Sequence, residues 1–252
     1  MENITIDVNH VHIRGDIHGC FDSELTELYT PGISRLGDQD VLLISGDSGA
    51  VFYNLKKNLN YIDDEKKQMK FIASRKYKII YVGGNHENYD RLLSSEQYEF
   101  QDVKVNGAKC KRILDNLYYL QNGEVIEFNG SKFLAIGGAR SIDKDSRVPH
   151  VNWWEQEIPS EGEIEKAFKA INDSEIDYVI SHTASNPTID ELMNLYPDKA
   201  TLLNVKKSHD ELSNFLELVR SSSIPHYFGH FHIDADLSFN EFCCYRKLRK
   251  II

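Results

Sequence analysis

Five short segments of the chain combine aspartate, asparagine or histidine with small residues, and each follows a run typical of a buried strand. They are Gly15-Asp16-Ile17-His18-Gly19, Gly46-Asp47, Gly84-Asn85-His86-Glu87, Ser181-His182-Thr183 and Gly229-His230-Phe231-His232. Carboxylate oxygens and imidazole nitrogens are the ligands with which hydrolases hold divalent transition metals. Because strand ends in an α/β fold bring distant parts of a sequence together, the five segments predict one shared metal site.

Together the segments offer two aspartates, one asparagine and five histidines. Two metals about 3.5–4 Å apart can clamp a phosphoryl group and generate hydroxide near neutral pH. A carboxylate that bridges them offsets two positive charges at short distance, and glycines suit turns where the backbone must approach the ions. The ligand types and their order therefore predict a phosphoester hydrolase with two metals.

The first three segments follow an alternation of strands and helices. We expect strands at 11–17, 40–45 and 77–82, with helices at 21–29 and 53–74 between them. The run Val-Leu-Leu-Ile in the second strand is typical of a strand that is covered on both faces. This βαβαβ order predicts parallel strands.

The second half of the chain has a different pattern. Asn129-Gly130 lies between two strand-like runs and is a strong hairpin signal, so we expect antiparallel pairing there. Ser160-Glu161-Gly162-Glu163 is a capping box, which predicts a helix through Ile171. The other expected elements are strands at 117–120, 124–128, 132–137, 178–181, 226–229 and 236–246 and a helix at about 205–220.

One domain spanning residues 1–252 is the simplest organisation, because no internal repeat and no Pro-, Gly- or Ser-rich linker divides the chain. Residues 139–159 lack periodicity and are long for a loop inside a compact domain. Loops of this length are usually functional, so we expect residues 139–159 to form a lid over the active site.

Composition excludes several classes of protein. Hydrophobic residues make up 41% of the chain and the net charge is −10, with no stripe of Lys and Arg, which argues against general nucleic-acid binding. No apolar run approaches the ~20 residues that span a bilayer, so we expect no membrane association. The polar N-terminus lacks the apolar segment of a signal peptide, and the four cysteines have no CxxC spacing. These features indicate a cytoplasmic protein with unpaired thiols.

In type and order, the five segments resemble the calcineurin-like metallophosphoesterase superfamily from Asp16 to His232, and residues 137–155 look like a bacterial and phage branch of it. The resemblance implies an α/β fold in which two mixed β-sheets pack as a sandwich flanked by helices. It also implies two divalent metals, and their ligands by position are Asp16, His18, Asp47, Asn85, His182, His230 and His232. Asp47 would bridge the metals, and His86 would protonate the leaving group or stabilise the transition state. We expect manganese, while iron, zinc, nickel or cobalt would suit the same ligands.

The chain departs from the family pattern after Asp47. In protein phosphatases and diadenosine tetraphosphate hydrolases the second segment continues into Asp-Arg-Gly, but here it continues as Ser-Gly-Ala. The arginine that holds phosphate is therefore missing from its usual place. We expect Arg140 and Arg147 of the lid to bind phosphate instead, because guanidinium matches phosphate with two hydrogen bonds. His150 is a weaker candidate, and Trp153-Trp154 suits packing better than stacking on a substrate.

The sequence thus predicts a phosphomonoesterase that uses a dinuclear metal centre and metal-bound hydroxide, with Asp47 and His86 as catalytic residues. Its partner would be a small phosphorylated substrate, either a nucleotide or a phosphoprotein. One alternative is a phosphodiesterase for cyclic or linear nucleotides, which the tryptophan pair and the absent Asp-Arg-Gly favour. A second alternative is a scaffold of the same fold that has lost catalysis, but every expected ligand is present.

Overall fold

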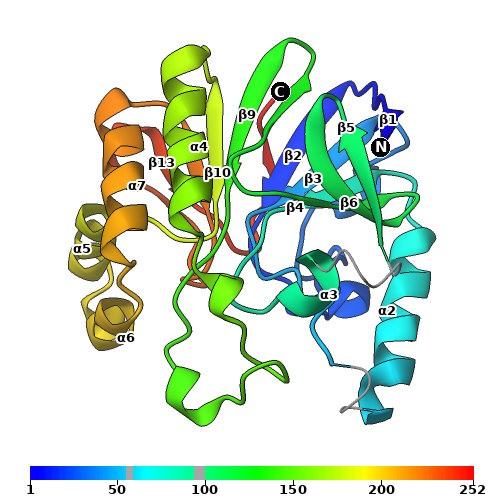
Figure 1. Ribbon diagram of the computed structural model, residues 1–252, viewed down its shortest axis with the longest axis horizontal. Coiled ribbons are helices and arrows are strands. Elements are labelled where there is room, and N and C mark those ends of the chain that lie inside the picture. The colour runs from blue at the N-terminus through cyan, green and yellow to red at the C-terminus, as the bar shows by residue number, and fades with distance from the viewer. Residues whose placement is uncertain (55–58, 94–99) are drawn as a thin grey trace.

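Two β-sheets face each other in the computed structural model, which describes residues 1–54, 59–93 and 100–252 (Figure 1). Within these residues the first sheet has eight strands, in the order β1 (Glu2–Ile4), β5 (Gln101–Val105), β6 (Ala108–Leu114), β7 (Leu117–Leu120), β4 (Lys78–Tyr81), β3 (Asp40–Ile44), β2 (His10–Arg14) and β14 (Arg249–Lys250). The second has six, in the order β12 (Ala235–Asp236), β13 (Glu241–Cys243), β11 (His226–Phe228), β10 (Tyr178–Ser181), β9 (Ser131–Ile136) and β8 (Val125–Phe128). Both sheets mix parallel and antiparallel pairs, which confirms the predicted sandwich of two mixed sheets.

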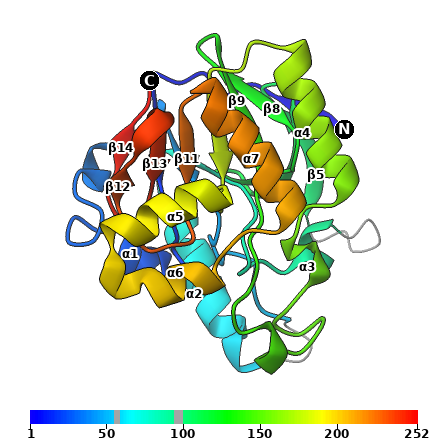
Figure 2. The same ribbon diagram turned by 90° about the vertical axis from the view of Figure 1, so that its left-hand side faces the viewer.

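Helices cover the outer faces of both sheets, as Figure 2 shows for the second sheet. They are α1 (Phe21–Glu24), α2 (Ile62–Ala73), α3 (Tyr89–Leu93), α4 (Glu161–Asp173), α5 (Asn186–Leu195), α6 (Ala200–Val205) and α7 (Asp210–Ser222). Apolar side chains of α4 and α7 pack on β9 and β10, and Ile72 of α2 packs on β3 and β4. None of these helices is long and apolar enough to cross a lipid bilayer.

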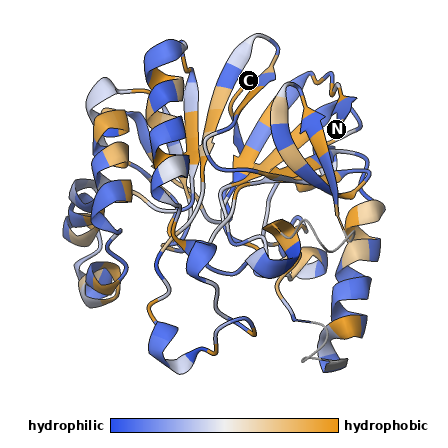
Figure 3. Ribbon diagram, in the orientation of Figure 1, coloured by the Kyte–Doolittle hydropathy of each residue, from blue (hydrophilic) through white to orange (hydrophobic). Residues whose placement is uncertain are grey.

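One cluster of buried side chains from both sheets fills the space between them. Figure 3 shows the many hydrophobic residues in the strands of both sheets. The first sheet contributes Val11, Ile13 and Leu43, and the second contributes Phe133 and Ile180. Each residue alternates along its strand with one that faces the outer helices, because successive side chains of a strand point to opposite faces. Burial on both faces explains the continuous apolar runs of these strands.

Most predicted elements are present, some with shorter bounds, while the strands expected at 117–120 and 178–181 keep their expected bounds. β2, β3 and β4 are parallel as expected, and β8 and β9 form the hairpin at Asn129-Gly130. The capping box of α4 is formed, with Ser160 accepting from Glu163 and the Glu163 side chain returning to Ser160. The helix expected at 21–29 ends at Glu24.

Three further expected elements differ from the structure in extent. In the expected helix 53–74, residues 53–54 are not helical, α2 covers Ile62–Ala73, and residues 55–58 lie outside the described residues. The expected helix 205–220 is wrong at its start, because α6 ends at Val205 and α7 begins only at Asp210. The expected strand 236–246 is interrupted, since a 3₁₀ turn separates β12 from β13.

Residues 139–159 contain two short 3₁₀ turns and no longer element, and they project from the end of the molecule opposite the β8–β9 hairpin (Figure 1). Trp154 anchors this segment, because its side chain is buried in the cluster between the first sheet and its outer helices. The segment is therefore tied to the core, while Arg140 and Lys144 stay exposed.

Candidate metal centre

The five segments lie in five loops, each directly after a strand. β2, β3 and β4 are neighbours in the first sheet, and β10 and β11 are neighbours in the second. Because the strands within each group are parallel, their carboxyl ends share one edge of the sheet. The two edges lie side by side, and the side chains that meet there are Asp16, His18, Asp47, Asn85, His86, His182, His230 and His232.

A first group of potential ligands consists of Asp16, His18 and His232. Oδ2 of Asp16 lies 3.0 Å from Nε2 of His232 and 3.6 Å from Nε2 of His18. The two imidazole Nε2 atoms are 3.0 Å apart. The other carboxylate oxygen, Oδ1, accepts a hydrogen bond from the backbone N–H of His230 at 2.9 Å, so the carboxylate is fixed with Oδ2 toward the histidines.

A second group consists of Asp47, His182 and His230. Oδ1 of Asp47 lies 3.2 Å from Nε2 of His182, and its Oδ2 lies 3.9 Å from Nδ1 of His18 in the first group. Asp47 therefore stands between the two groups, as a bridging carboxylate must. Nδ1 of His182 donates to the carbonyl of Ser45 at 2.8 Å, so Nε2 is the nitrogen that faces Asp47 and can bind a metal after losing its proton.

The residues at this position fit a metal centre. Four of their buried polar atoms have no hydrogen-bond partner within the described part of the chain, and they are Asp16 Oδ2, Asn85 Oδ1, His182 Nε2 and His230 Nε2. An unpaired buried polar atom is costly, and native proteins rarely keep several of them together. All four are donor atoms suited to a divalent cation, which would satisfy them at once.

The backbone at the site is also unusual. His18, Asp47, His230 and His232 have φ of 53°, 46°, 71° and 53°, in the left-handed region that residues with a Cβ rarely adopt. Strained backbone of this kind concentrates at functional sites, where the surrounding structure enforces it. Gly84 allows a close approach, since a Cβ there would overlap Oδ1 of Asp47.

Charges within the centre oppose the effect of burial on both carboxylates. Burial alone favours the neutral acids, but the neighbouring imidazoles of His18 and His232 hold the pKa of Asp16 well below its usual value. For Asp47, the charges of His182 and His86 likewise outweigh burial and lower its pKa. Burial lowers the pKa of His182, but Asp47 reverses this and raises it to about 9. Both carboxylates are thus kept ionised, which is the form that binds metal.

This geometry agrees with a comparison of sequences, in which a model of the calcineurin-like phosphoesterases matches residues 10–234. The chain belongs to the calcineurin-like phosphoesterase family. No curated protein matches the chain. Membership of the family and the two groups of Asp and His side chains together support a metal-dependent phosphoesterase.

Of the two arginines predicted to bind substrate in this calcineurin-like phosphoesterase, Arg147 lies at the centre. Its Nη2 is 3.1 Å from Nε2 of His86, and its Nη1 donates to the carbonyls of Asn85 at 3.0 Å and Asn152 at 3.4 Å. Its Nε pairs with Asp143 at 2.8 Å. Burial, together with the nearby charges of His18 and Arg147, lowers the pKa of His86 to about 4 although Asp47 opposes the shift.

The other lid residues named from the sequence lie apart from the ligands. Arg140 is exposed and lines a second cavity of about 560 Å³ together with Lys144 and Trp153, so its role in substrate binding stays a prediction. His150 pairs with Asp90 at 2.9 Å on the surface. Trp154 is buried, as its expected packing role requires.

The metal-centre cavity, with a volume of about 260 Å³, is lined by two charged residues that were not predicted from the sequence. Lys206, directly after α6, is buried there and its Nζ donates to the carbonyl of His230. Asp143 lines the same cavity and holds Arg147. No motif surrounds Lys206 in the sequence, whereas Asp143 stands four residues before Arg147.

Glu87, the last residue of the third segment, has a positioning role that was not predicted. Its carboxylate is fully buried and accepts hydrogen bonds from the backbone N–H of Ser48 at 2.8 Å, Gly49 at 3.3 Å and Gly84 at 2.8 Å. Burial and the charge of Asp47 raise its pKa to about 7. Glu87 thus joins the loop of Asp47 to the loop of Asn85.

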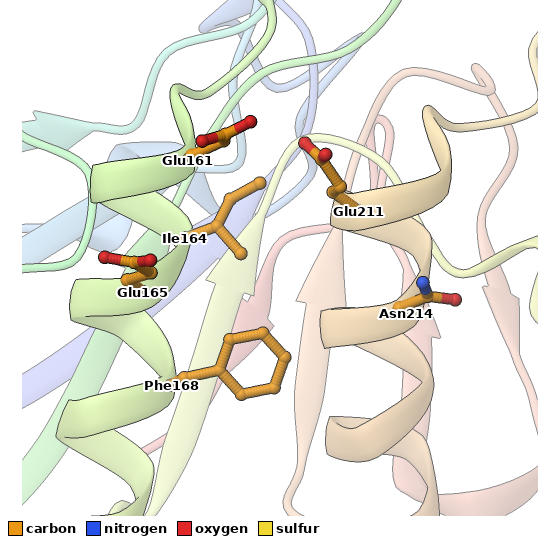
Figure 4. A pocket seen from close by; sticks show the side chains of 6 residues that line it. All are labelled: Glu161, Ile164, Glu165, Phe168, Glu211 and Asn214. Carbon is orange, nitrogen blue, oxygen red and sulfur yellow. The ribbon is translucent and has the colours of Figure 1, made fainter.

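A further cavity of about 310 Å³ lies between α4 and α7 (Figure 4). Ile164 and Phe168 of α4 point toward α7, and Glu161 and Glu211 stand at its end. It shares no lining residue with the metal centre, so it has no direct part in the chemistry of the phosphoesterase.

Proposed function

We propose that the protein is a metal-dependent phosphomonoesterase. The observation that carries this proposal is the pair of cations, Arg147 and Lys206, that line the small cavity together with the metal ligands. A phosphate monoester has close to two negative charges near neutral pH, whereas a diester has one. Two side-chain cations beside the metal ligands therefore suit a dianionic phosphoryl group.

Two divalent ions would be held by the residues grouped above. Asp16, His18, Asp47 and His232 would hold one ion, and Asp47, Asn85, His182 and His230 would hold the other, with manganese as the expected metal. When bound, such ions polarise a phosphoryl group and lower the pKa of water. The unpaired atoms Asp16 Oδ2, Asn85 Oδ1, His182 Nε2 and His230 Nε2 support this assignment.

Arg147 would bind a phosphate oxygen. A guanidinium has five N–H donors. Those of Nε and Nη1 reach Asp143, Asn85 and Asn152, and one of Nη2 reaches His86. In the described part of the chain, the second N–H of Nη2 has no partner, so it can bind an oxygen of the substrate. Lys206, with one N–H on the carbonyl of His230, has two further donors for the same group.

His86 would protonate the departing oxygen as an imidazolium, which the ring would form by taking up a proton when the dianionic substrate binds, since burial leaves the free ring neutral near pH 7. Because Arg147 can only donate, Nε2 of His86 accepts in this arrangement and its proton lies on Nδ1. Asp47 fixes the residue by accepting a hydrogen bond from its backbone N–H at 2.8 Å. Replacing His86 with Ala should lower kcat most for poor leaving groups, and an equal fall for all leaving groups would contradict proton donation.

The proposal can be tested with two aryl esters in the presence of Mn²⁺. We expect p-nitrophenyl phosphate to be hydrolysed faster than bis(p-nitrophenyl) phosphate. The Lys206→Met variant should lose roughly tenfold in kcat/KM for the monoester, the effect of about 1.5 kcal/mol from one charged hydrogen bond, and less for the diester. Lys207→Met is a matched control, because Lys207 pairs with Asp190 on the surface. Faster hydrolysis of the diester would overturn the proposal.

A phosphodiesterase is the second candidate, supported by the cavity of about 560 Å³ next to the lid. Arg140, Lys144 and Trp153 line it and would suit the second ester group of a nucleotide. In that case Arg140→Ala should weaken diester hydrolysis and leave monoester hydrolysis unchanged. A scaffold without catalysis would bind metal but hydrolyse neither ester.

We also propose a cytoplasmic location, because all four cysteines are unpaired.

A further inference from the structure

A second group of metal-binding side chains lies at the other end of the strands that carry the metal centre. His10 and His12 belong to β2, and Asp40 is the first residue of β3. β2 and β3 are parallel, and His10 is paired in register with Asp40. Asp16 and Asp47 follow the ends of these strands, so the group lies about 13–20 Å from them along β2.

Strand geometry brings the three side chains together on one face. His10 and His12 are two residues apart, so they point to the same side of the sheet, and Asp40 in register with His10 points there too. Nδ1 of His10 lies 3.0 Å from Oδ1 of Asp40, and Nε2 of His12 lies 3.8 Å from the same oxygen. The three ligand atoms lie within 4.8 Å of one another.

These distances suit one transition-metal ion. Zinc binds imidazole nitrogen and carboxylate oxygen at about 2.0–2.2 Å, so two ligands of a tetrahedral ion are about 3.3 Å apart. The separations of 3.0 and 3.8 Å bracket this value. Two histidines and one aspartate are a common set of three protein ligands, with the remaining position open to water.

The neighbours of the group leave these atoms available. Oδ2 of Asp40 accepts a hydrogen bond from the backbone N–H of Gly37 at 2.7 Å, which orients Oδ1 toward the histidines. The side chains of His12 and Asp40 are only 15% and 13% exposed, while that of His10 is 45% exposed and gives access from solvent. Burial lowers the pKa of His12 despite the opposing charge of Asp40, which favours the neutral imidazole that binds metal. Lys250, in register with His12 on β14, is an unfavourable charge nearby.

We propose that His10, His12 and Asp40 bind one divalent transition metal, with zinc as the reference ion, at a site separate from the phosphoesterase centre. The ion would join the first residues of two adjacent strands and stabilise this end of the sheet, because it binds only the folded chain. The competing explanation is a simple ion pair between His10 and Asp40, which needs no metal and no contribution from His12.

The number of zinc ions bound per chain distinguishes the two explanations. We would dialyse the full-length protein against buffered Zn²⁺ and measure bound metal by elemental analysis. The His12→Gln variant should bind one ion fewer than the wild type. His150→Gln is a matched control, because His150 forms a comparable pair with Asp90 at 2.9 Å but, among the residues that the structure describes, belongs to no such group of ligands. Equal binding by wild type and His12→Gln would overturn the proposal.

Two further measurements keep the test independent of folding and of the phosphoesterase centre. Asp40→Asn preserves the hydrogen bond from Gly37 but supplies a much weaker ligand, so it should also lose one ion while retaining the circular dichroism spectrum of the wild type. In the Asp47→Asn background, which weakens the dinuclear centre, His12→Gln should still remove one ion. If it removes none there, the loss seen in the wild type belongs to the dinuclear centre and the proposal fails.

Discussion

Arg147 places Nη2 3.1 Å from Nε2 of His86, and Asp143 holds the same guanidinium through Nε at 2.8 Å. The segment 139–159 thus contributes an arginine to the candidate metal centre from a point 61 residues away in sequence from His86. In protein phosphatases of this family, an arginine of the second segment binds the phosphate. Here Asp47 is followed by Ser48, Gly49 and Ala50, and Arg147 lies beside His86.

Replacing Arg147 with Lys should reduce catalysis although the charge remains. Lysine has three donors on one atom, so it cannot contact Asp143, Asn85, His86 and phosphate together. We expect kcat/KM for p-nitrophenyl phosphate to fall roughly 100-fold, the usual effect of losing one donor to a transition state. Arg75→Lys, on a half-buried arginine that lies over Phe71 away from the metal centre, is the control. Unchanged kinetics for Arg147→Lys would exclude Arg147 from substrate binding.

Replacing Glu87 with Gln should lower both stability and metal affinity. The buried carboxylate accepts from three backbone N–H groups, and an amide would direct its own N–H₂ at one of them. An unsatisfied buried donor costs about 2 kcal/mol in the free energy of unfolding. Urea unfolding of the metal-free protein and Mn²⁺ titration measure the two effects. Glu165→Gln, on the exposed face of α4, should change neither quantity. If Glu87→Gln has the same free energy of unfolding and the same Mn²⁺ affinity as the wild type, Glu87 does not join the loops.

The ligand segments were predictable because each is a local pattern after a strand. Asp16 and Asp47 follow apolar runs typical of adjacent parallel strands. The carboxyl ends of such strands lie at the same edge of the sheet, so the side chains that follow them lie close together. Lys206 was not predictable in this way. It reaches the cavity only because α6 ends beside the loop of His230, and packing between distant elements has no signature in a single sequence.

Two omissions in the fold have local signals that were present in the sequence. Asn106-Gly107 has the same pattern as Asn129-Gly130, and both of its residues have positive φ in the turn that joins β5 and β6. Ser185 caps α5 by accepting from the backbone N–H of Thr188, and Pro187 occupies the first turn. The expected helix 205–220 ends two residues before the end of α7 at Ser222. Its start was misplaced because α6 ends at Val205 and α7 begins only at Asp210.

His226 and Glu241 form a buried pair that should contribute strongly to stability. Nδ1 of His226 lies 3.1 Å from Oε1 of Glu241, and its Nε2 lies 2.7 Å from Oγ of Ser181. The order resembles a Ser-His-carboxylate triad, but all three residues are 0% exposed, so no substrate reaches them. His226→Leu would remove a partner from the buried Glu241, and we expect a loss of about 3 kcal/mol in the free energy of unfolding.

Urea unfolding measures this loss, and His209→Leu, at an exposed histidine before α7, is the control. At low temperature the His226→Leu protein should still hydrolyse phosphoester, because none of the three residues lines the metal-centre cavity. A stability equal to that of the wild type would mean that the pair contributes no net free energy.

Glu24 should make stability depend on pH. Burial opposes ionisation of this carboxyl, but hydrogen bonds from Arg246 and Arg14 outweigh it and lower the pKa below the ordinary 4.5. A group whose pKa is lowered by folding stabilises the protein above its unfolded pKa, and this stabilisation is lost as the pH falls through the folded pKa. Glu24→Gln should therefore unfold at lower urea than the wild type at neutral pH. The difference should shrink when the pH falls below about 4.

Glu217→Gln, at an exposed position of α7, should match the wild type at every pH. A difference for Glu24→Gln that stays constant with pH would mean that its charge is not involved.

The ion pair between Glu24 and Arg14 also concerns the metal centre, because Nη2 of Arg14 donates to the carbonyl of Asp16 at 3.0 Å. Glu24 therefore supports the loop that carries the first ligand.

Gly84 tests how closely the loops must approach each other. Its φ is not in the left-handed region, so alanine is acceptable to the backbone, but the added Cβ would overlap Oδ1 of Asp47 and lie 2.5 Å from its backbone nitrogen. Asp47 would have to move away from both groups of ligands. We expect Gly84→Ala to weaken Mn²⁺ binding roughly 10- to 100-fold, as loss of the groups that orient a ligand does.

Gly162 provides the matched comparison, because a Cβ there meets nothing within 4 Å and the residue lies in α4, where alanine is favoured by up to about 1 kcal/mol. Calorimetric titration with Mn²⁺ and thermal unfolding of the metal-free protein separate the two variants. Gly162→Ala should bind metal normally and unfold at an equal or higher temperature. Normal metal binding by Gly84→Ala would mean that Asp47 can shift without consequence, which a carboxylate shared by two metals cannot do.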